Sequence, residues 1–139
     1  MKSFVLDASV ALRWFLDSPV PAYANRVKQM FLKGTRALVP ALWHLEMSNG
    51  LAVAERRSLL APADVDRAMI DLEQVVTQAV DTDSGLASVR QTLATARSFQ
   101  LSAYDAVYLD LARRERLPLA TLDDRLRAAG ARAGVELLR

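Results

Sequence analysis

Short apolar runs that end at polar residues alternate with helical segments along this chain, and this alternation restricts the possible folds more than any other feature. Residues 4–6 form an unbroken apolar run that stops at Asp7, as in a strand buried on both faces of a parallel sheet. Further strands are predicted at residues 37–39, 79–80, 119–121 and 135–138. This order predicts an α/β protein, an α/β/α sandwich around a central, mostly parallel sheet of about four to five strands.

The segments between these runs have the periodicity of amphipathic helices. Apolar residues recur at helical spacing from Tyr23 to Phe31, and Gly34 follows them as a residue suited to end a helix. The other helices are predicted at residues 41–56, 65–76, 86–96, 103–114 and 124–129. No linker or repeat interrupts the pattern, so residues 1–139 are predicted to form a single domain.

Composition narrows the class of protein further. Hydrophobic residues make up 52% of the chain, which is enough to bury a core. The lack of cysteine excludes disulfides, thiolate zinc sites and cysteine nucleophiles. Eighteen basic and sixteen acidic side chains leave a net charge of +2, which does not by itself indicate a nucleic-acid binder. No uncharged run approaches the roughly 20 residues of a membrane helix, so we expect a cytoplasmic protein that does not enter the membrane.

Four acidic residues lie among apolar neighbours. Asp7 and Asp123 each follow a predicted strand, so their carboxylates can share one edge of the sheet if the two strands are neighbours. The helical faces that carry Glu46 and Asp105 are otherwise largely apolar. Gly50 lies on the same face as Glu46, and because a glycine within a helix costs about 1 kcal/mol relative to alanine, it predicts a close approach by another segment.

Each of these acids also has a purely structural explanation. Asp7 and Asp123 could cap the helices that follow them, and Asp105 could form a capping box with Ser102. Glu46 could point into water. Four carboxylates in one crevice, however, would repel one another strongly unless a cation were bound. Oxygen donors with neither cysteine nor converging histidines suit Mg²⁺ or Mn²⁺, so this arrangement predicts metal-assisted hydrolysis of phosphodiesters.

Four segments together resemble the PIN-domain ribonucleases and, within them, the VapC-type toxins of bacterial toxin–antitoxin pairs. The segments span residues 5–12, 43–51, 101–109 and 119–123. The resemblance covers nearly the whole chain, and four such segments at this spacing are specific, although each alone is weak.

The resemblance implies a function and a set of site residues. Asp7, Glu46, Asp105 and Asp123 would form an acidic site for Mg²⁺ or Mn²⁺ and catalyse cleavage of RNA. The polar residues that it implies around them are Ser9, Asn49 and Thr121. It also implies endoribonuclease activity on structured RNA, a homodimer and a cognate antitoxin protein that blocks the site. We expect apolar surface on the helices at 23–31 and 65–76 to be covered by these partners.

Several alternatives stay open at this point. His44 and Glu46 have the spacing of a zinc deaminase motif, but the cysteine pair of that motif is missing. Asp124 is an alternative ligand to Asp123. Asp83 precedes Gly85 in a sequence that could bind metal, although Asp83 or Ser84 is expected to cap the helix at 86–96. A phosphorylated receiver domain and a PIN-like binding module without catalysis are the competing functional classes.

Charged pairs outside the four acids are interpreted as surface features. Asp110 is expected to pair with Arg114 one helical turn away. The basic groups at 56–57 and 113–116 are expected to be solvated helix ends. As a hypothesis, either group could contact RNA phosphates near the crevice.

Overall fold

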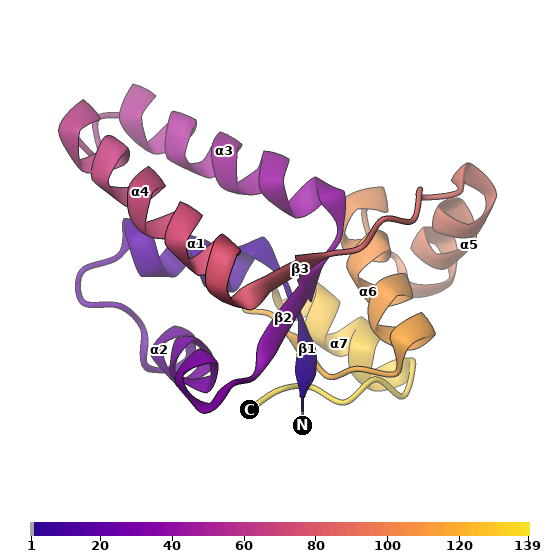
Figure 1. Cartoon of the computed structure of the whole chain (residues 1–139). Helices are drawn as coiled ribbons and strands as arrows, with labels where there is room; N and C mark the ends of the chain where they lie inside the picture. The colour runs from indigo at the N-terminus through magenta and orange to yellow at the C-terminus, as the bar shows by residue number, and fades with distance from the viewer. Residues whose placement is uncertain (1) are drawn as a thin grey trace.

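The computed structural model describes residues 2–139 and has a four-stranded sheet with helices on both sides (Figure 1). The chain begins with β1 (Ser3–Leu6), α1 (Ala8–Leu16), α2 (Ala22–Gln29), the 3₁₀ turn η1 (Met30–Lys33) and β2 (Arg36–Val39). It continues through α3 (Ala41–Arg56), α4 (Pro62–Ala79), β3 (Val80–Thr82), α5 (Val89–Phe99), α6 (Ala103–Glu115), β4 (Leu119–Ala120) and α7 (Asp124–Arg132). The expected α/β/α architecture is therefore confirmed.

All strand pairs are parallel, and the strand order is β3-β2-β1-β4. The chain starts at the middle of the sheet, adds β2 and β3 on one side, and then crosses to place β4 on the other side of β1. All four strands consequently end at the same edge of the sheet, which we call the carboxyl edge. The residue after β1 and the residues after β4 are neighbours there.

The core explains why β1 is an unbroken apolar run. Phe4, Val5 and Leu6 are all fully buried because helices cover both faces of the central strand (Figure 1). Helices α1–α4 lie on one side of the sheet, and α5–α7 lie on the other (Figure 1). Trp43 of α3 and Tyr108 of α6 are the largest fully buried side chains.

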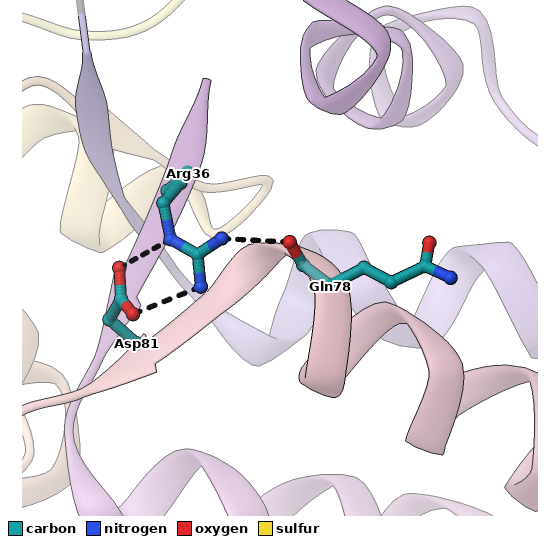
Figure 2. A network of polar contacts seen from close by, with 3 residues as sticks. All are labelled: Arg36, Gln78 and Asp81. Carbon is teal, nitrogen blue, oxygen red and sulfur yellow. Dashed lines mark hydrogen bonds and ion pairs between the residues drawn. The ribbon is translucent and has the colours of Figure 1, made fainter. Parts of the chain in front are cut away.

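An ion pair joins the second strand to the edge strand β3 (Figure 2). The Arg36 guanidinium donates to both carboxylate oxygens of Asp81, at 2.8 and 3.0 Å, and to the main-chain oxygen of Gln78 at 2.8 Å. The bidentate contact lowers the pKa of Asp81. Asp81 thus connects the two strands and is not free to belong to a metal-binding loop.

Two predicted boundaries were wrong. The helix expected at 86–96 begins at Val89, where the Ser88 hydroxyl accepts from the Gln91 amide at 3.3 Å. Asp83 does not cap it, because its carboxylate pairs with Arg114 at 2.8 Å. The strand expected at 135–138 is reduced to one bridge between Leu119 and Leu137. Its partner β4 has only two residues, so a longer ladder cannot form.

The close approach predicted at Gly50 is made by α1. A β-carbon on Gly50 would lie 2.4 Å from Cδ2 and 2.9 Å from Cδ1 of Leu12. We expect Gly50→Ala to be more favourable by about 1–2 kcal/mol in a Leu12→Ala background than in the native chain, because the shorter side chain removes the overlap. Chemical denaturation of the two single variants and the double variant measures this difference. Additive effects would show that the two residues do not interact.

Candidate metal centre at the carboxyl edge

The site is built on the parallel pairing of β1 with β4. Leu6 is in register with Ala120, and the Asp7 amide donates to the Ala120 oxygen at 2.9 Å. Asp7 and Thr121 therefore leave the sheet side by side at the carboxyl edge. The expectation that Asp7 and Asp123 lie at the same edge holds because their strands are neighbours.

Asp7 is buried, with only 4% of its surface exposed. Its Oδ2 accepts from the hydroxyls of Ser9 and Thr121, each at 2.7 Å. Ser9 Oγ in turn accepts from the Leu122 amide at 3.0 Å, and Thr121 Oγ1 accepts from the Asp123 amide at 3.0 Å. Although Asp7 precedes α1, its side chain makes no capping hydrogen bond, so the capping explanation fails for this residue.

Asp123 and Asp105 combine local structure with a place in the site. Asp123 does cap α7, because its Oδ1 accepts from the Leu126 amide at 2.9 Å. Ser102 caps α6 by accepting from the Asp105 amide at 3.1 Å, which places Asp105 in the first turn. Both carboxylates nonetheless belong to one group of charges: Asp123 raises the pKa of Asp7, and Asp123 and Asp7 both raise the pKa of Asp105.

Glu46 reaches the site from α3 on the opposite side of the sheet. Its Oε1 accepts a 2.6 Å hydrogen bond from the hydroxyl of Tyr108, which is fully buried on α6. In the sequence, Tyr108 belongs to the largely apolar helical face that carries Asp105, and nothing there pairs it with Glu46. A hydroxyl three residues after an inward-facing acid on the same helix face was the signal that could have identified it.

The electrostatics show that the four carboxylates are brought together. We call Asp7, Glu46, Asp105 and Asp123 the carboxylate site. Burial raises the pKa of Asp7, and the charge of Asp123 raises it further against the hydroxyl hydrogen bonds. Burial also raises the pKa of Glu46 and of Asp105, with smaller contributions in the same direction from the other acids of the site. Cation binding would relieve this repulsion.

The chemistry of these donors fits Mg²⁺ or Mn²⁺, since all of them are carboxylate oxygens. Within residues 2–139, no three acidic or histidine side chains converge closely enough to hold an ion directly as they stand. Mg²⁺ commonly keeps several water ligands and uses only one or two carboxylates. The site therefore suits a divalent cation in two respects: its donors are carboxylate oxygens, and their negative charges repel one another.

Other predicted residues lie outside the carboxylate site. Asn49 is exposed on α3, and in the described part of the chain its side chain makes no hydrogen bond to the four acids. Asp124 is exposed in the first turn of α7. His44 forms a hydrogen bond with Thr82, between Nε2 and Oγ1 at 2.8 Å, whereas Glu46 is bonded to Tyr108.

One prediction about charged side chains was wrong. Asp110 does not pair with Arg114, because its Oδ1 accepts from Thr95 Oγ1 at 2.6 Å and Arg114 turns to Asp83. Arg113, in the last turn of α6, and Arg116, the residue that caps it, lie about 12 and 16 Å from Asp105 along the helix axis, at a rise of roughly 1.5 Å per residue.

Comparison with known proteins identifies the family. The model of the PIN domain family matches residues 4–131, and the chain belongs to this family. Its members are typically metal-dependent nucleases. The family match removes the receiver-domain alternative. No helix among residues 2–139 is both long and apolar enough to cross a membrane.

Two solved structures are similar to this chain. PAE2754 from Pyrobaculum aerophilum is 25% identical with a TM-score of 0.65, and the alignment covers 91% of this chain and 78% of that one. FitAcB from Neisseria gonorrhoeae is 19% identical with a TM-score of 0.67, covering 98% of this chain and 96% of that one. The second likeness concerns the fold alone. No curated protein matches the chain.

The hydrogen bond from Tyr108 to Glu46 leads to a first prediction about the site. If the site hydrolyses nucleic acid, as is typical of the family, Tyr108→Phe should slow cleavage at least about 10-fold, because a hydrogen bond to a charged group contributes about 1.5–3 kcal/mol. Its loss also raises the pKa of Glu46 further. Cleavage rates at neutral pH measure the effect. Tyr104→Phe, on the exposed side of the same helix, is the matched control and should cleave at the native rate.

The raised pKa values predict the pH dependence of stability without metal. Between the ordinary aspartate pKa of 3.8 and the raised pKa of Asp7, the folded chain binds more protons than the unfolded chain. In EDTA, this residue's contribution to the free energy of unfolding therefore increases as pH falls through that window, and is complete below 3.8. Denaturation of the native chain and of Asp7→Asn across pH isolates the contribution. A native chain that loses stability relative to the variant on acidification would contradict the assignment.

Proposed function

We propose that this protein is an endoribonuclease that depends on Mg²⁺ or Mn²⁺ and hydrolyses RNA phosphodiesters at the carboxylate site. The single observation that carries the proposal is the gathering of four acids at the carboxyl edge, where burial and the neighbouring carboxylates raise the pKa of Asp7, Glu46 and Asp105. Membership of a family of nucleases supports the reaction class. The choice of RNA rests on the resemblance of the four sequence segments to the VapC-type ribonucleases.

The residues have distinct roles in this proposal. Asp7, Asp105 and Asp123 would hold the ion, and Glu46 would complete the site or position the attacking water. The bound ion would supply a nucleophile from water at neutral pH and neutralise charge on the transferred phosphate. Ser9 and Thr121 fix the Asp7 carboxylate in one orientation through their hydroxyl groups. Tyr108 orients the half-buried Glu46 carboxylate in the same way, and its hydrogen bond stabilises the negative charge of that carboxylate.

Incubation of the purified protein with structured and unstructured RNA tests the activity. Cleavage in Mg²⁺ or Mn²⁺ that stops with EDTA and returns with excess metal is the expected result. Intact RNA in the presence of a folded protein and metal would refute the nuclease proposal and favour a PIN-like binding module. Undiminished cleavage in EDTA would refute the metal dependence.

We further propose that the protein is the toxin of a toxin–antitoxin pair and forms a homodimer. Besides the resemblance, exposed apolar side chains on the α3–α4 hairpin support a protein partner. These residues are Leu45, Leu59, Met69 and Ile70, of which Leu45 and Leu59 are each 71% exposed. The apolar side chains at 23–31 contribute less than expected, because Tyr23 and Phe31 pack against the core.

Expression in bacteria tests the toxin role. The native protein should arrest growth, and co-expression of the product of the adjacent reading frame should restore growth and yield a stable complex. Growth arrest that persists with that product present would contradict the pairing. Growth arrest by a catalytically inactive variant would show that toxicity does not depend on cleavage.

A further inference from the structure

A cleft of about 800 Å³ lies between α2, α7 and the C-terminal segment, and its lining is rich in arginine. Arg26 of α2 and Arg127 of α7 both lie over the ring of Tyr23, each with its guanidinium carbon 5.6 Å from the ring centre. We define these three residues as the arginine cleft. Within residues 2–139, neither arginine forms an ion pair with an acid. Glu136 and Arg139 also line the cleft, so its charged side chains comprise three arginines and one acid, and that acid pairs with neither Arg26 nor Arg127.

The arginine cleft is directly connected to the carboxylate site. Arg127 donates from one terminal nitrogen to the Thr121 main-chain oxygen at 3.0 Å. The side chain of the same Thr121 donates to Asp7 at 2.7 Å. One residue thus separates the wall of the cleft from the most buried acid of the site. The other basic helix end, at Arg113 and Arg116, has no such connection.

This position solves an electrostatic problem for a nuclease. Four clustered carboxylates repel a phosphodiester chain, so substrate approach requires cations beside the site as well as within it. A guanidinium lying over a ring keeps its planar N–H edge available for a bidentate contact with phosphate. The aromatic contact also limits the conformations of each arginine before the substrate arrives, so less entropy is lost on binding.

We propose that the arginine cleft binds backbone phosphates of the RNA substrate on one side of the scissile bond. The proposal rests on the proposed nuclease function. Because the contacts are made to phosphates, the cleft contributes affinity and placement rather than base preference. It also assigns Tyr23 a positioning role, since its ring holds both guanidinium groups.

A second arginine pair supplies a matched control. Arg113 and Arg132 lie over the ring of Phe99, at 5.6 and 5.9 Å, and Arg132 also donates to a main-chain oxygen, that of Phe99, at 3.1 Å. This pair therefore has the same charge, the same kind of aromatic contact and one member on α7. It differs in having no connection to the carboxylate site.

The experiment measures how salt affects binding of a short mixed-sequence single-stranded RNA in EDTA. Each phosphate contact on a single strand contributes roughly 0.7 to the slope of log affinity against log salt. Loss of both contacts in Arg26→Gln/Arg127→Gln should lower the magnitude of the slope by about 1.4, while Arg113→Gln/Arg132→Gln should keep the native slope. Equal slopes in the two double variants, or no binding by the native protein, would overturn the proposal.

Cleavage of the same RNA in Mg²⁺ is followed in parallel, which separates this proposal from the nuclease proposal. Cleavage together with an unchanged salt slope in Arg26→Gln/Arg127→Gln would refute the arginine cleft and leave the nuclease in place. A reduced slope in Arg26→Gln/Arg127→Gln, with no cleavage by the native protein, would support phosphate binding in the arginine cleft and refute the nuclease. Circular dichroism of both double variants confirms that they are folded before the slopes are compared.

Discussion

Asp7→Asn is expected to abolish RNA cleavage and, at the same time, to stabilise the protein in EDTA. The asparagine has the same shape and can accept the hydroxyl hydrogen bonds of Ser9 and Thr121 through its amide oxygen. The substitution removes a negative charge that burial and the nearby Asp123 disfavour, which should stabilise the metal-free protein. It also removes a carboxylate that would bind the cation.

The two effects of Asp7→Asn are measured separately. Cleavage in Mg²⁺ should fall at least about 100-fold, as expected when a group that stabilises transition-state charge is lost. The free energy of unfolding in EDTA at pH 7 should rise by about 1–3 kcal/mol, because the substitution removes a negative charge whose burial the two hydroxyl hydrogen bonds only partly offset. Asp124→Asn, which removes an exposed carboxylate one residue from Asp123, is the control and should change neither quantity appreciably. An active Asp7→Asn variant would refute the assignment of Asp7.

Addition of Mg²⁺ or Mn²⁺ is expected to stabilise the native chain strongly, because the ion binds the folded site and relieves its repulsion. At a metal concentration of 100 times Kd, the gain is about 2.7 kcal/mol. Thermal unfolding with and without metal measures it. The stabilisation should largely disappear in Asp7→Asn and persist in Glu136→Gln, an exposed acid near the opposite edge of the sheet.

Two other outcomes of the thermal unfolding experiment would contradict a metal site. Equal stabilisation of all three proteins by the metal would indicate general ionic effects rather than a site. If metal failed to stabilise even the native chain, no ion would bind the carboxylate site at these concentrations.

Local sequence was sufficient to predict features that depend on neighbouring residues. The apolar run of β1 and the acids that follow β1 and β4 place Asp7 and Asp123 at one edge once the sheet is parallel. Gly50 similarly predicted a close approach within a helix, although it could not identify Leu12 as the partner. The periodicity of apolar residues shows which face of a helix or strand is buried, and the positions of these residues follow from that.

Partners distant in sequence could not be predicted in the same way. The hydrogen bond from Tyr108 to Glu46 joins α6 to α3, and Arg114 selects Asp83 over its helical neighbour Asp110. Helical spacing fixes only which side chains are near each other on one helix. The choice among several possible acids depends on how α6 packs beside the loop after β3, and only the tertiary structure contains that information.

Direct titration with Mn²⁺, followed by the electron paramagnetic resonance signal of the free ion, tests the central claim that the carboxylate site binds a divalent cation. The native chain should bind at least one ion, and Asp7→Asn should bind it at least about 10-fold more weakly. Native-like Mn²⁺ binding by the folded Asp7→Asn variant, or no binding by the folded native chain, would contradict the account.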